Sequence, residues 1–378
     1  MALHPCGKHV LVRRSFLTAL LLAGCLWPPA QRAFASQFVI DISVDGLGSV
    51  YLEPMVACGQ LPNFRRFQTE GACTNNARND DNMTVTLPNH TTMVTGRGVL
   101  GPDGHRWTKN SDPPRGMTLH SNRGFYVASV LDVAHDHGLR TGLYAGKRKF
   151  SLYAVSYDAR HGAADLFSPD HGRNKLDVYV YDKKLPSLVS RFVAAMRVRP
   201  MNYSLVHFAD TDSVGHLRGW GSAAYNQAIR EADVQLGRIF DLVDNDPRLF
   251  GKTTIILSAD HGGKNYDHGN NLLPEVYTIP FYVWGCGAAR GQNLYAMNGL
   301  TRRNPGPCRA SFADLVQPVR NGDGANLALQ LLGLGPVPGS TINARQELII
   351  DGPVYIETHR RPQWLRWRRL ALRGCTRG

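Results

Sequence analysis

Apolar runs of strand length alternate with helical patterns along most of the chain. β-Branched and aromatic residues gather in five such runs, at 37–48, 141–146, 203–209, 253–259 and 279–285. Segments with apolar residues at helical spacing lie between them, at 125–138, 185–197 and 223–243. Continuous apolar strands that alternate with helices are typical of a mostly parallel sheet covered on both faces. The pattern therefore predicts an α/β fold, a three-layer α/β/α sandwich.

One stretch near the end of the chain departs from this alternation. Residues 286–325 are rich in Gly, Pro, Arg and Asn, and we expect an extended surface excursion there. A last helical pattern follows at 326–333. The predicted sandwich thus carries inserted loop or small cap segments.

Polar side chains recur where the predicted strands end. Asp45 follows the first strand, Asp212 and His216 follow the strand at 203–209, and Asp260 and His261 follow the strand at 253–259. In an open α/β sheet, the loops at the carboxyl ends of the strands line the ligand crevice. Separate pieces of chain are therefore expected to deliver carboxylates and imidazoles to one edge of the sheet.

The formal charge of +13 is concentrated at the two ends of the chain. Residues 1–35 carry four basic residues and no acid, and residues 359–378 carry seven arginines and no acid. The body between them, a single domain at 36–358, is close to neutral. No specific nucleic-acid binding is therefore expected of the body.

The first 35 residues read as an export signal. A charged start is followed by the apolar run FLTALLLAG (16–24), which is too short to span a bilayer, and by the small-residue pattern that ends at Ala35. Within it, RRSFL (13–17) resembles a twin-arginine signal, and the residues before Cys25 resemble a lipobox. We expect a periplasmic or extracellular protein, cleaved after Ala35 or, alternatively, tethered to the membrane through a lipidated Cys25.

The tail and the cysteines allow two interpretations each. Residues 359–378 include WLRWRRLALRG, which could touch anionic lipid as a basic amphipathic piece or could be solvated. Export permits the disulfides Cys58–Cys73 and Cys286–Cys308, but buried, inert thiols are an equal alternative. No CxxC motif occurs, which argues against a thiolate zinc site.

Two short motifs supply metal-binding side chains. In DSVGH (212–216), a carboxylate and an imidazole four residues apart can converge on one cation, with the glycine letting a loop pass close to it. In LSADHGG (257–263), Asp260 and His261 are adjacent, and His268 follows in DHGN. Neighbours on an extended strand point to opposite faces, so using both requires a loop or two different metals.

Together with Asp45, these motifs provide six candidate ligands. Two zinc-like ions with three protein ligands each would keep positions open for a substrate, as catalytic sites require. Paired ions are the recurring arrangement for displacement at phosphorus. Such an ion could also activate Thr86 in TLPNHTTMVTGRG (86–98) by favouring loss of its proton, since the hydroxyl is otherwise a poor nucleophile.

Five motifs in order then resemble a known family. VDGLG (44–48), TLPNHTTMVTG (86–96), DSVGH (212–216), SADHGG (258–263) and DHGN (267–270) follow the order of the alkaline phosphatase superfamily. The chain is most similar to its type I phosphodiesterase and nucleotide pyrophosphatase branch, from about residue 38 to 335. This resemblance implies an alkaline-phosphatase-like fold.

The resemblance also implies roles for individual residues. Thr86 would be the nucleophile and would form a covalent phosphothreonine. Asp212, His216 and His268 would hold one metal ion. The second ion would be held by Asp45, Asp260 and His261 together with the Thr86 oxygen.

The resemblance also implies roles for residues other than the metal ligands and Thr86. Asn110 is expected to donate to a non-bridging phosphate oxygen, as a family asparagine does at a slightly shorter spacing. Lys147 is a candidate for contact with phosphate, like a lysine in some monoesterase relatives, although 147–149 also reads as a solvated basic run. His90 is expected to support the loop by hydrogen bonding. Thr91, Thr92 and Thr95 are expected to cap a helix.

The expected function is metal-dependent hydrolysis of phosphodiester or nucleotide pyrophosphate bonds, with two divalent ions, most favourably Zn²⁺. The partner would be a small phosphate ester or nucleotide. A phosphomonoesterase or a phosphonate hydrolase on the same site is an alternative. A non-catalytic, tethered binding protein on the same scaffold is an alternative of another class, but such a protein should have lost a ligand or Thr86, and none is missing.

Overall fold

The structure is a computed structural model that describes residues 36–165 and 172–352. The predicted export signal, including Cys25, and the basic tail at 359–378 lie outside these residues. Among the residues that are described, no helix combines the length and the apolar character needed to cross a membrane.

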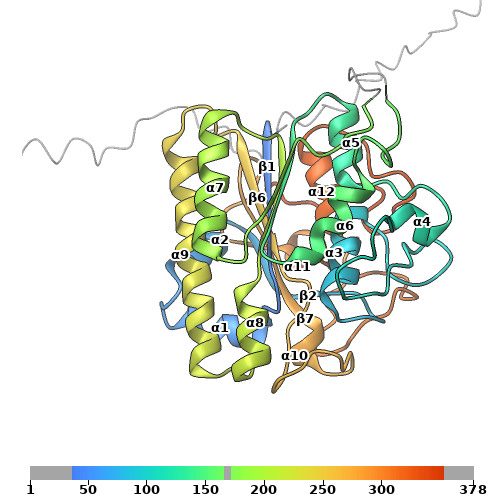
Figure 1. Ribbon diagram of the computed structural model, residues 1–378. Coiled ribbons are helices and arrows are strands. Elements are labelled where there is room, and N and C mark those ends of the chain that lie inside the picture. The colour runs from blue at the N-terminus through green and yellow to red at the C-terminus, as the bar shows by residue number, and fades with distance from the viewer. Residues whose placement is uncertain (1–35, 166–171, 353–378) are drawn as a thin grey trace, which may run out of the picture. The chain divides into compact units, whose positions relative to one another are not determined.

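An eight-stranded sheet runs through the centre of the fold, in the order β4-β3-β5-β1-β6-β7-β2-β8 (Figure 1). All neighbouring strands are parallel except at β7, which is antiparallel to both β6 and β2. The predicted, mostly parallel sheet is confirmed. The strands are β1 (Phe38–Val44), β2 (Gly71–Arg78), β3 (Thr141–Ala145), β4 (Val178–Tyr181), β5 (Tyr203–Phe208), β6 (Thr253–Ser258), β7 (Thr278–Gly285) and β8 (Gln292–Asn293).

Helices cover both faces of this sheet, as a three-layer sandwich requires (Figure 1). One layer contains α1 (Ser49–Ala57), α2 (Pro62–Glu70), α7 (Leu185–Val198), α8 (Asp210–Arg218) and α9 (Ala223–Asn245). The other contains α3 (Thr86–Thr95), α5 (Val130–Asp136), α6 (Ser151–Ser156) and α12 (Asp323–Leu331). Shorter helices lie outside these layers: α4 (Leu119–Arg123), α10 (Pro274–Tyr277), α11 (Leu294–Met297) and the 3₁₀ turn η1 (Arg148–Phe150).

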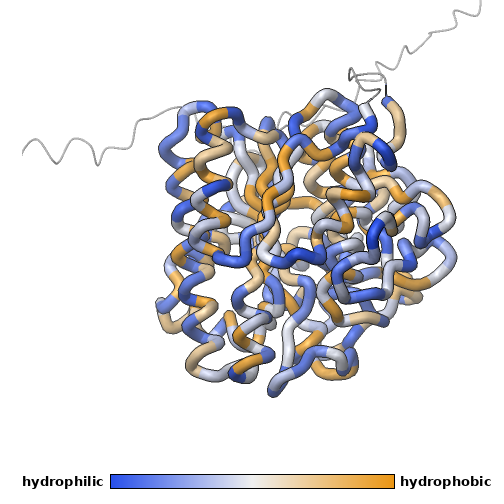
Figure 2. Tube along the Cα trace, viewed as in Figure 1, coloured by the Kyte–Doolittle hydropathy of each residue, from blue (hydrophilic) through white to orange (hydrophobic). Residues whose placement is uncertain are grey.

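The central strands are apolar because they are covered on both faces (Figure 2). In β1, Val39, Ile40, Ile42 and Val44 are completely buried. β5 and β6 flank β1 on its two sides in parallel register, and every one of their residues is buried. The three strands therefore form a rigid platform whose carboxyl ends share one edge.

Several predicted boundaries are wrong for local reasons. DSVGH was expected in a loop, but it lies inside α8, where a four-residue spacing puts Asp212 and His216 on one helix face. The helix expected at 125–138 begins only at Val130, because Ser129 caps it through a capping box with Asp132. Residues 286–325 are largely irregular as expected, although β8 and α11 interrupt them.

The four described cysteines are free thiols. Cys58 and Cys308 are exposed, whereas Cys73 and Cys286 are partly buried. The structure therefore does not form the disulfides Cys58–Cys73 and Cys286–Cys308, and the expectation of inert buried thiols fits only the second two residues.

Candidate functional site

The candidate site lies at the carboxyl edge of the sheet, where four neighbouring strands end. Lys147 follows β3, Asp212 follows β5, Asp45 follows β1 and Asp260 follows β6. These strands are adjacent in that order within the sheet. Residues up to 215 positions apart in sequence are thereby brought to one place.

Gly46 makes the turn after β1 possible. Its φ of 71° is in the left-handed region, and a Cβ there would lie 2.9 Å from the Cα of Asp212. The Gly46 amide donates to Asp260 Oδ1 at 3.0 Å, and its carbonyl accepts from Trp220 Nε1 and from the Tyr225 hydroxyl, each at 2.8 Å. Only glycine can thus hold the three carboxylates this close together.

The first group of predicted ligands, which we call the inner cluster, consists of Asp45, Asp260 and His261. All three side chains are completely buried. His261 Nε2 lies 3.2 Å from Asp260 Oδ2 and 3.7 Å from Asp45 Oδ1. Because His261 Nδ1 faces the Gly262 carbonyl at 2.8 Å, it carries the proton, and Nε2 presents a lone pair to the carboxylates.

The second group, the outer cluster, consists of Asp212, His216 and His268. Asp212 Oδ1 lies 3.4 Å from His216 Nε2 and 3.7 Å from His268 Nε2, and the two Nε2 atoms are 3.1 Å apart. Nδ1 of each histidine donates to a backbone carbonyl, Tyr266 for His216 and Thr84 for His268. Two lone pairs therefore face each other across 3.1 Å, an arrangement that a cation between them would relieve.

Four acceptor atoms of the two clusters lack a hydrogen-bond partner. Asp45 Oδ1, Asp212 Oδ1, Asp260 Oδ2 and His261 Nε2 are buried without any hydrogen-bond partner. Buried acceptors of this kind are costly unless something pairs with them. The ligand atoms of Asp45, Asp260 and His261, and those of Asp212, His261 and His268, lie within 4.8 Å of one another. Carboxylate and imidazole donors in these groups fit divalent ions such as Zn²⁺.

Charge is unevenly distributed among the inner residues. Burial alone would raise the pKa of Asp45, but the Lys147 ammonium and a hydrogen bond from His207 outweigh it and hold that pKa well below its ordinary value. Burial, followed by the charge of Asp45, raises the pKa of Asp260 well above its ordinary value. Burial also lowers the pKa values of His261 and His268, which keeps both imidazoles neutral and able to bind a metal.

Lys147 lies inside the site and is not part of a solvated run. Its Nζ is 2.7 Å from Asp45 Oδ2, 2.6 Å from Asp212 Oδ2 and 3.4 Å from Thr86 Oγ1. Burial opposes its charge, but the two carboxylates raise its pKa. Lys147 thus engages the Oδ2 atoms and leaves both Oδ1 atoms unpaired. The solvated interpretation holds for Arg148, whose side chain is 72% exposed.

Thr86 is the first residue of α3 and is buried beside these groups. Asn89 fixes the segment before it, because its amide donates to the carbonyls of Met83 and Val85 at 2.6 and 3.2 Å. Asn110 lies next to Thr86, where its Oδ1 accepts from the Leu87 amide at 2.9 Å and from Lys149 Nζ at 3.1 Å. The structure therefore brings every predicted site residue to one edge of the sheet.

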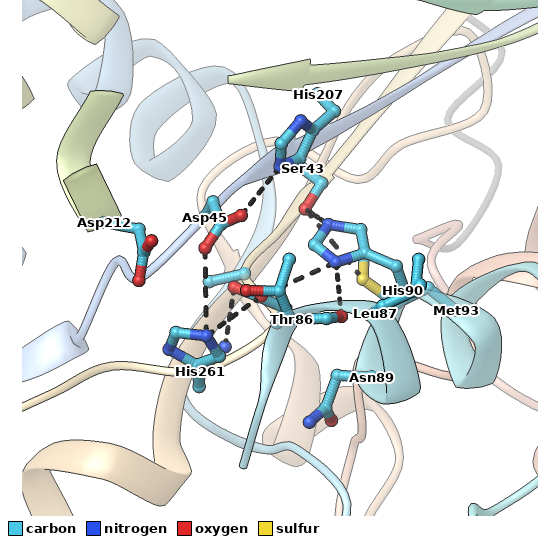
Figure 3. Close-up of polar contacts among 12 residues, drawn as sticks. Ser43, Asp45, Thr86, Leu87, Asn89, His90, Met93, His207, Asp212 and His261 are labelled. Atoms are coloured by element: carbon cyan, nitrogen blue, oxygen red, sulfur yellow. Dashed lines mark hydrogen bonds and ion pairs between the residues drawn. The ribbon is translucent and has the colours of Figure 1, made fainter. Parts of the chain in front are cut away.

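His90 supports the loop, as expected. Its Nδ1 donates to the Thr86 carbonyl at 2.8 Å, and its Nε2 faces Ser43 Oγ at 2.7 Å (Figure 3). Burial and the neighbouring His207 lower the pKa of His90 to about 3, so its ring is neutral. The neutral ring suits a supporting role.

The expectation that Thr91, Thr92 and Thr95 cap a helix is wrong. All three lie within α3, and their hydroxyls donate back to carbonyls one turn earlier, for example Thr91 to Leu87 at 2.8 Å and Thr95 to Thr91 at 2.6 Å. Threonine hydroxyls do this when the helix side is buried and no water can reach them. These three hydroxyls therefore form hydrogen bonds within α3, and we assign them no part in catalysis.

Sequence reasoning missed two residues that contact the site. His207 lies within β5, and its Nε2 is 2.8 Å from Asp45 Oδ2 (Figure 3). Lys149 reaches Asn110 although its neighbour Arg148 points to solvent. A histidine in an otherwise apolar strand was the only available signal for His207, since its contact depends on the pairing of β5 with β1.

Comparison with known proteins shows to which family the chain belongs. Residues 39–277 match the family model described as type I phosphodiesterase / nucleotide pyrophosphatase. The chain belongs to this family. The resemblance to this family that the five motifs indicate is therefore confirmed.

The individual relatives are only distantly similar to this chain, and they are longer than it is. The chain is 28% identical over 267 residues to ectonucleotide pyrophosphatase/phosphodiesterase family member 3 of Rattus norvegicus, covering 68% of this chain but 28% of the relative. It is 30% identical over 155 residues to GPI ethanolamine phosphate transferase 1 of Mus musculus, covering 38% of this chain and 16% of the relative. The chain thus spans less than a third of the length of these curated relatives.

Solved structures support the fold alone. The murine ectonucleotide pyrophosphatase/phosphodiesterase 5, in an inactive form in complex with AMP, matches with a TM-score of 0.57 and 15% identity, covering 83% of this chain and 100% of that one. A protein of the alkaline phosphatase superfamily from Vibrio parahaemolyticus matches with a TM-score of 0.54 and 16% identity, covering 86% and 72%. The predicted alkaline-phosphatase-like fold is confirmed.

Proposed function

We propose that this protein hydrolyses phosphate esters, most favourably phosphodiester or nucleotide pyrophosphate bonds, through a covalent phosphothreonine on Thr86. The observation that carries the proposal is the set of four unpaired buried acceptors beside Thr86. Such acceptors at a family-typical position are suited to a pair of divalent ions, for which Zn²⁺ is our first choice. The inner cluster would hold one ion and the outer cluster the other.

When bound, the two ions would favour the ionised Thr86 hydroxyl and neutralise charge on the phosphate oxygens. Thr86 Oγ1 attacks phosphorus, the bond from phosphorus to the leaving oxygen breaks, and the leaving group departs as an alcohol or a phosphate. Water then hydrolyses the phosphothreonine, which restores the Thr86 hydroxyl. Each half of the reaction is a displacement at phosphorus that needs a fixed nucleophile and fixed positive charge.

The chain's own groups contribute the rest. Thr86 lies at the N-terminus of a ten-residue helix, where the helix dipole favours negative charge. Lys147 Nζ, at 3.4 Å from Thr86 Oγ1, would stabilise the Thr86 oxygen as it loses its proton. Asn110 Oδ1 is occupied by the Leu87 amide and Lys149, which directs its remaining amide group to donate to a non-bridging oxygen.

One observation favours phosphomonoester hydrolysis as a second candidate function. Lys147 lies beside Thr86 and Lys149 lies beside Asn110. Their two positive charges would complement the second negative charge of a monoester. Lys149→Met should therefore lower kcat/KM for p-nitrophenyl phosphate about tenfold more than for bis(p-nitrophenyl) phosphate. Equal losses on both substrates would remove the support for a monoesterase.

The test of the main proposal is a comparison of kcat/KM for a diester, a monoester, a phosphonate and a dinucleotide pyrophosphate with metal-loaded protein. The proposal expects turnover of phosphate esters, highest with the diester or the pyrophosphate. A metal-loaded protein that hydrolyses none of the four would refute it and favour the non-catalytic binding protein.

We further propose that the protein acts outside the cytoplasm, as its first 35 residues suggest. Fractionation of cells that express the full chain checks this, with the expected signal in the periplasm, the medium or the membrane fraction through Cys25. A chain found only in the cytoplasmic fraction would contradict it.

A further inference from the structure

His207 is a completely buried histidine in the middle of the sheet. It lies on β5, opposite Ser43 of β1 on one side and opposite Ala145 of β3 on the other. No predicted role accounts for an imidazole at this position. Its contacts with the Gly146 amide, with two aromatic rings and with Asp45 explain what it does.

The proton of His207 is fixed by a backbone amide. The Gly146 amide donates to His207 Nδ1 at 3.1 Å and is shared with the His207 carbonyl at 3.2 Å; because an amide N–H facing Nδ1 can only donate, Nδ1 is the unprotonated nitrogen. The proton therefore resides on Nε2, which donates to Asp45 Oδ2 at 2.8 Å. One backbone group thus sets the direction of the hydrogen bond to Asp45.

The ring itself is held in place by aromatic neighbours. The Phe150 ring lies 4.2 Å away at 30°, and the His90 ring meets it edge-on at 4.9 Å. These contacts fix the plane of the imidazole. Gly146 also directly precedes Lys147, so one turn after β3 positions both groups that bind Asp45 Oδ2.

The consequence concerns how Asp45 shares its two oxygens. Oδ2 receives both His207 and Lys147. Oδ1 has no hydrogen-bond partner and lies 3.7 Å from His261 Nε2 (Figure 3). Without a fixed donor on Oδ2, the carboxylate could rotate and offer either oxygen to Lys147. A reserved Oδ1 is what a one-oxygen metal ligand requires.

We propose that His207 is a positioning residue for the inner cluster: it locks Asp45 so that Oδ1 is kept for the cation. This inference rests on the proposed function, because it assumes that the inner cluster binds a divalent ion. It assigns to a residue outside the family motifs the part that an outer hydrogen-bond partner takes at a metal site.

The test compares two substitutions of His207. The new side chains end in the same amide group but differ in length. In His207→Gln the amide can extend to where Nε2 donates, so Asp45 keeps its partner. In His207→Asn the amide ends near the Nδ1 position and falls short of Asp45. His105→Asn is the matched control, because His105 is also fully buried, accepts a backbone amide at Nδ1 and faces a side-chain oxygen with Nε2, but at Thr92.

The readout is binding of Zn²⁺ to metal-depleted full-length protein, in competition with a chromophoric chelator. Asp45→Asn and His216→Ala identify which binding step belongs to the inner and which to the outer cluster. We expect His207→Asn to weaken the inner step about 10- to 100-fold and to leave the outer step unchanged. His207→Gln and His105→Asn should bind like the unsubstituted protein.

Two results would overturn the inference about His207. One is an inner step in His207→Asn as tight as in His105→Asn, and the other is an equal weakening by His207→Gln and His207→Asn. Failure of the proposed function is distinguishable, because it would appear as no hydrolysis of any phosphate ester by the unsubstituted, Zn²⁺-loaded protein, whereas the inner Zn²⁺ step reports on His207.

Discussion

The middle of strand β1 and the turn that follows the strand carry the same chemical group in opposite states. Asp41 and Asp45 are both buried and lie four residues apart, on the same face of the chain. Asp41 has one polar side-chain contact, the Tyr203 hydroxyl at 3.2 Å, and burial raises its pKa to about 7. Asp45 meets Lys147, His207 and His261, and its pKa is held well below the ordinary value.

The difference shows what marks a site in a buried sheet. Burial alone favours the neutral form of a carboxyl group, as at Asp41. A buried carboxylate that stays charged needs positive charge around it, and at Asp45 one oxygen still lacks a partner. The carboxyl end of β1 is therefore built around cations, whereas the middle of the strand favours the neutral form of Asp41.

The largest effect is expected at Thr86, beside the charged end. Thr86→Ala removes the nucleophile, so turnover of bis(p-nitrophenyl) phosphate should fall about 10⁴-fold or more. Bound Zn²⁺ should be largely retained, because the six cluster residues are untouched. Initial rates and metal analysis of the same sample check this, and a near-normal rate would place the nucleophile elsewhere.

The comparison itself is tested by neutralising each acid in turn. Asp45→Asn removes a charged ligand and should weaken the inner Zn²⁺ step by about 10²-fold or more, with a parallel loss of activity. Asp41→Asn should leave the Zn²⁺ stoichiometry and the rate unchanged. Equal losses from both substitutions, measured by chelator competition, would mean that the two positions do not differ as described.

The pH dependence of stability should distinguish Asp41 more finely. A folded pKa near 7 against an ordinary value of 3.8 means that the unfolded chain ionises first, so Asp41 costs stability as the pH rises between those values. Relative to the unsubstituted protein, Asp41→Asn should gain about 3 kcal/mol between about pH 5 and about pH 8. Urea unfolding of metal-loaded samples measures this, and a pH-independent gap would refute a neutral Asp41.

The smallest effect is expected at Ser43, which lies between the two acids. Ser43 Oγ donates to His90 Nε2, so Ser43→Ala leaves one buried acceptor unpaired and should lower the free energy of unfolding by about 1–3 kcal/mol. Metal affinity should not change. Urea unfolding and Zn²⁺ titration report the two quantities separately, and a marked loss of metal affinity would extend the site further down β1 than we describe.

Much of the fold could be predicted because its central strands are buried on both faces. β1, β5 and β6 appear in the sequence as mostly apolar runs with few interruptions. β2 was missed because its sequence, GACTNNAR, is mostly small or polar, and its place in the sheet comes from pairing with β7. β4 is short and half-buried, so its four residues gave no periodic signal.

The site was predictable to the extent that it consists of local motifs. Asp212 and His216, or Asp260 and His261, are close in sequence, whereas His207 and Lys149 are defined by which strands and turns become neighbours. The loop expected for DSVGH was wrong because Gly215 suggests a turn, yet it packs against the Trp220 ring inside α8. Strand order, which periodicity does not encode, decides these contacts.

The central claim is that the charged end of β1 works only with divalent cations. Its most direct test is to titrate metal-depleted protein with Zn²⁺ while bound metal and hydrolysis of bis(p-nitrophenyl) phosphate are measured together. We predict no turnover without metal and an activity that rises until two equivalents are bound. Full turnover of the metal-depleted protein, or activity unrelated to bound metal, would contradict the claim.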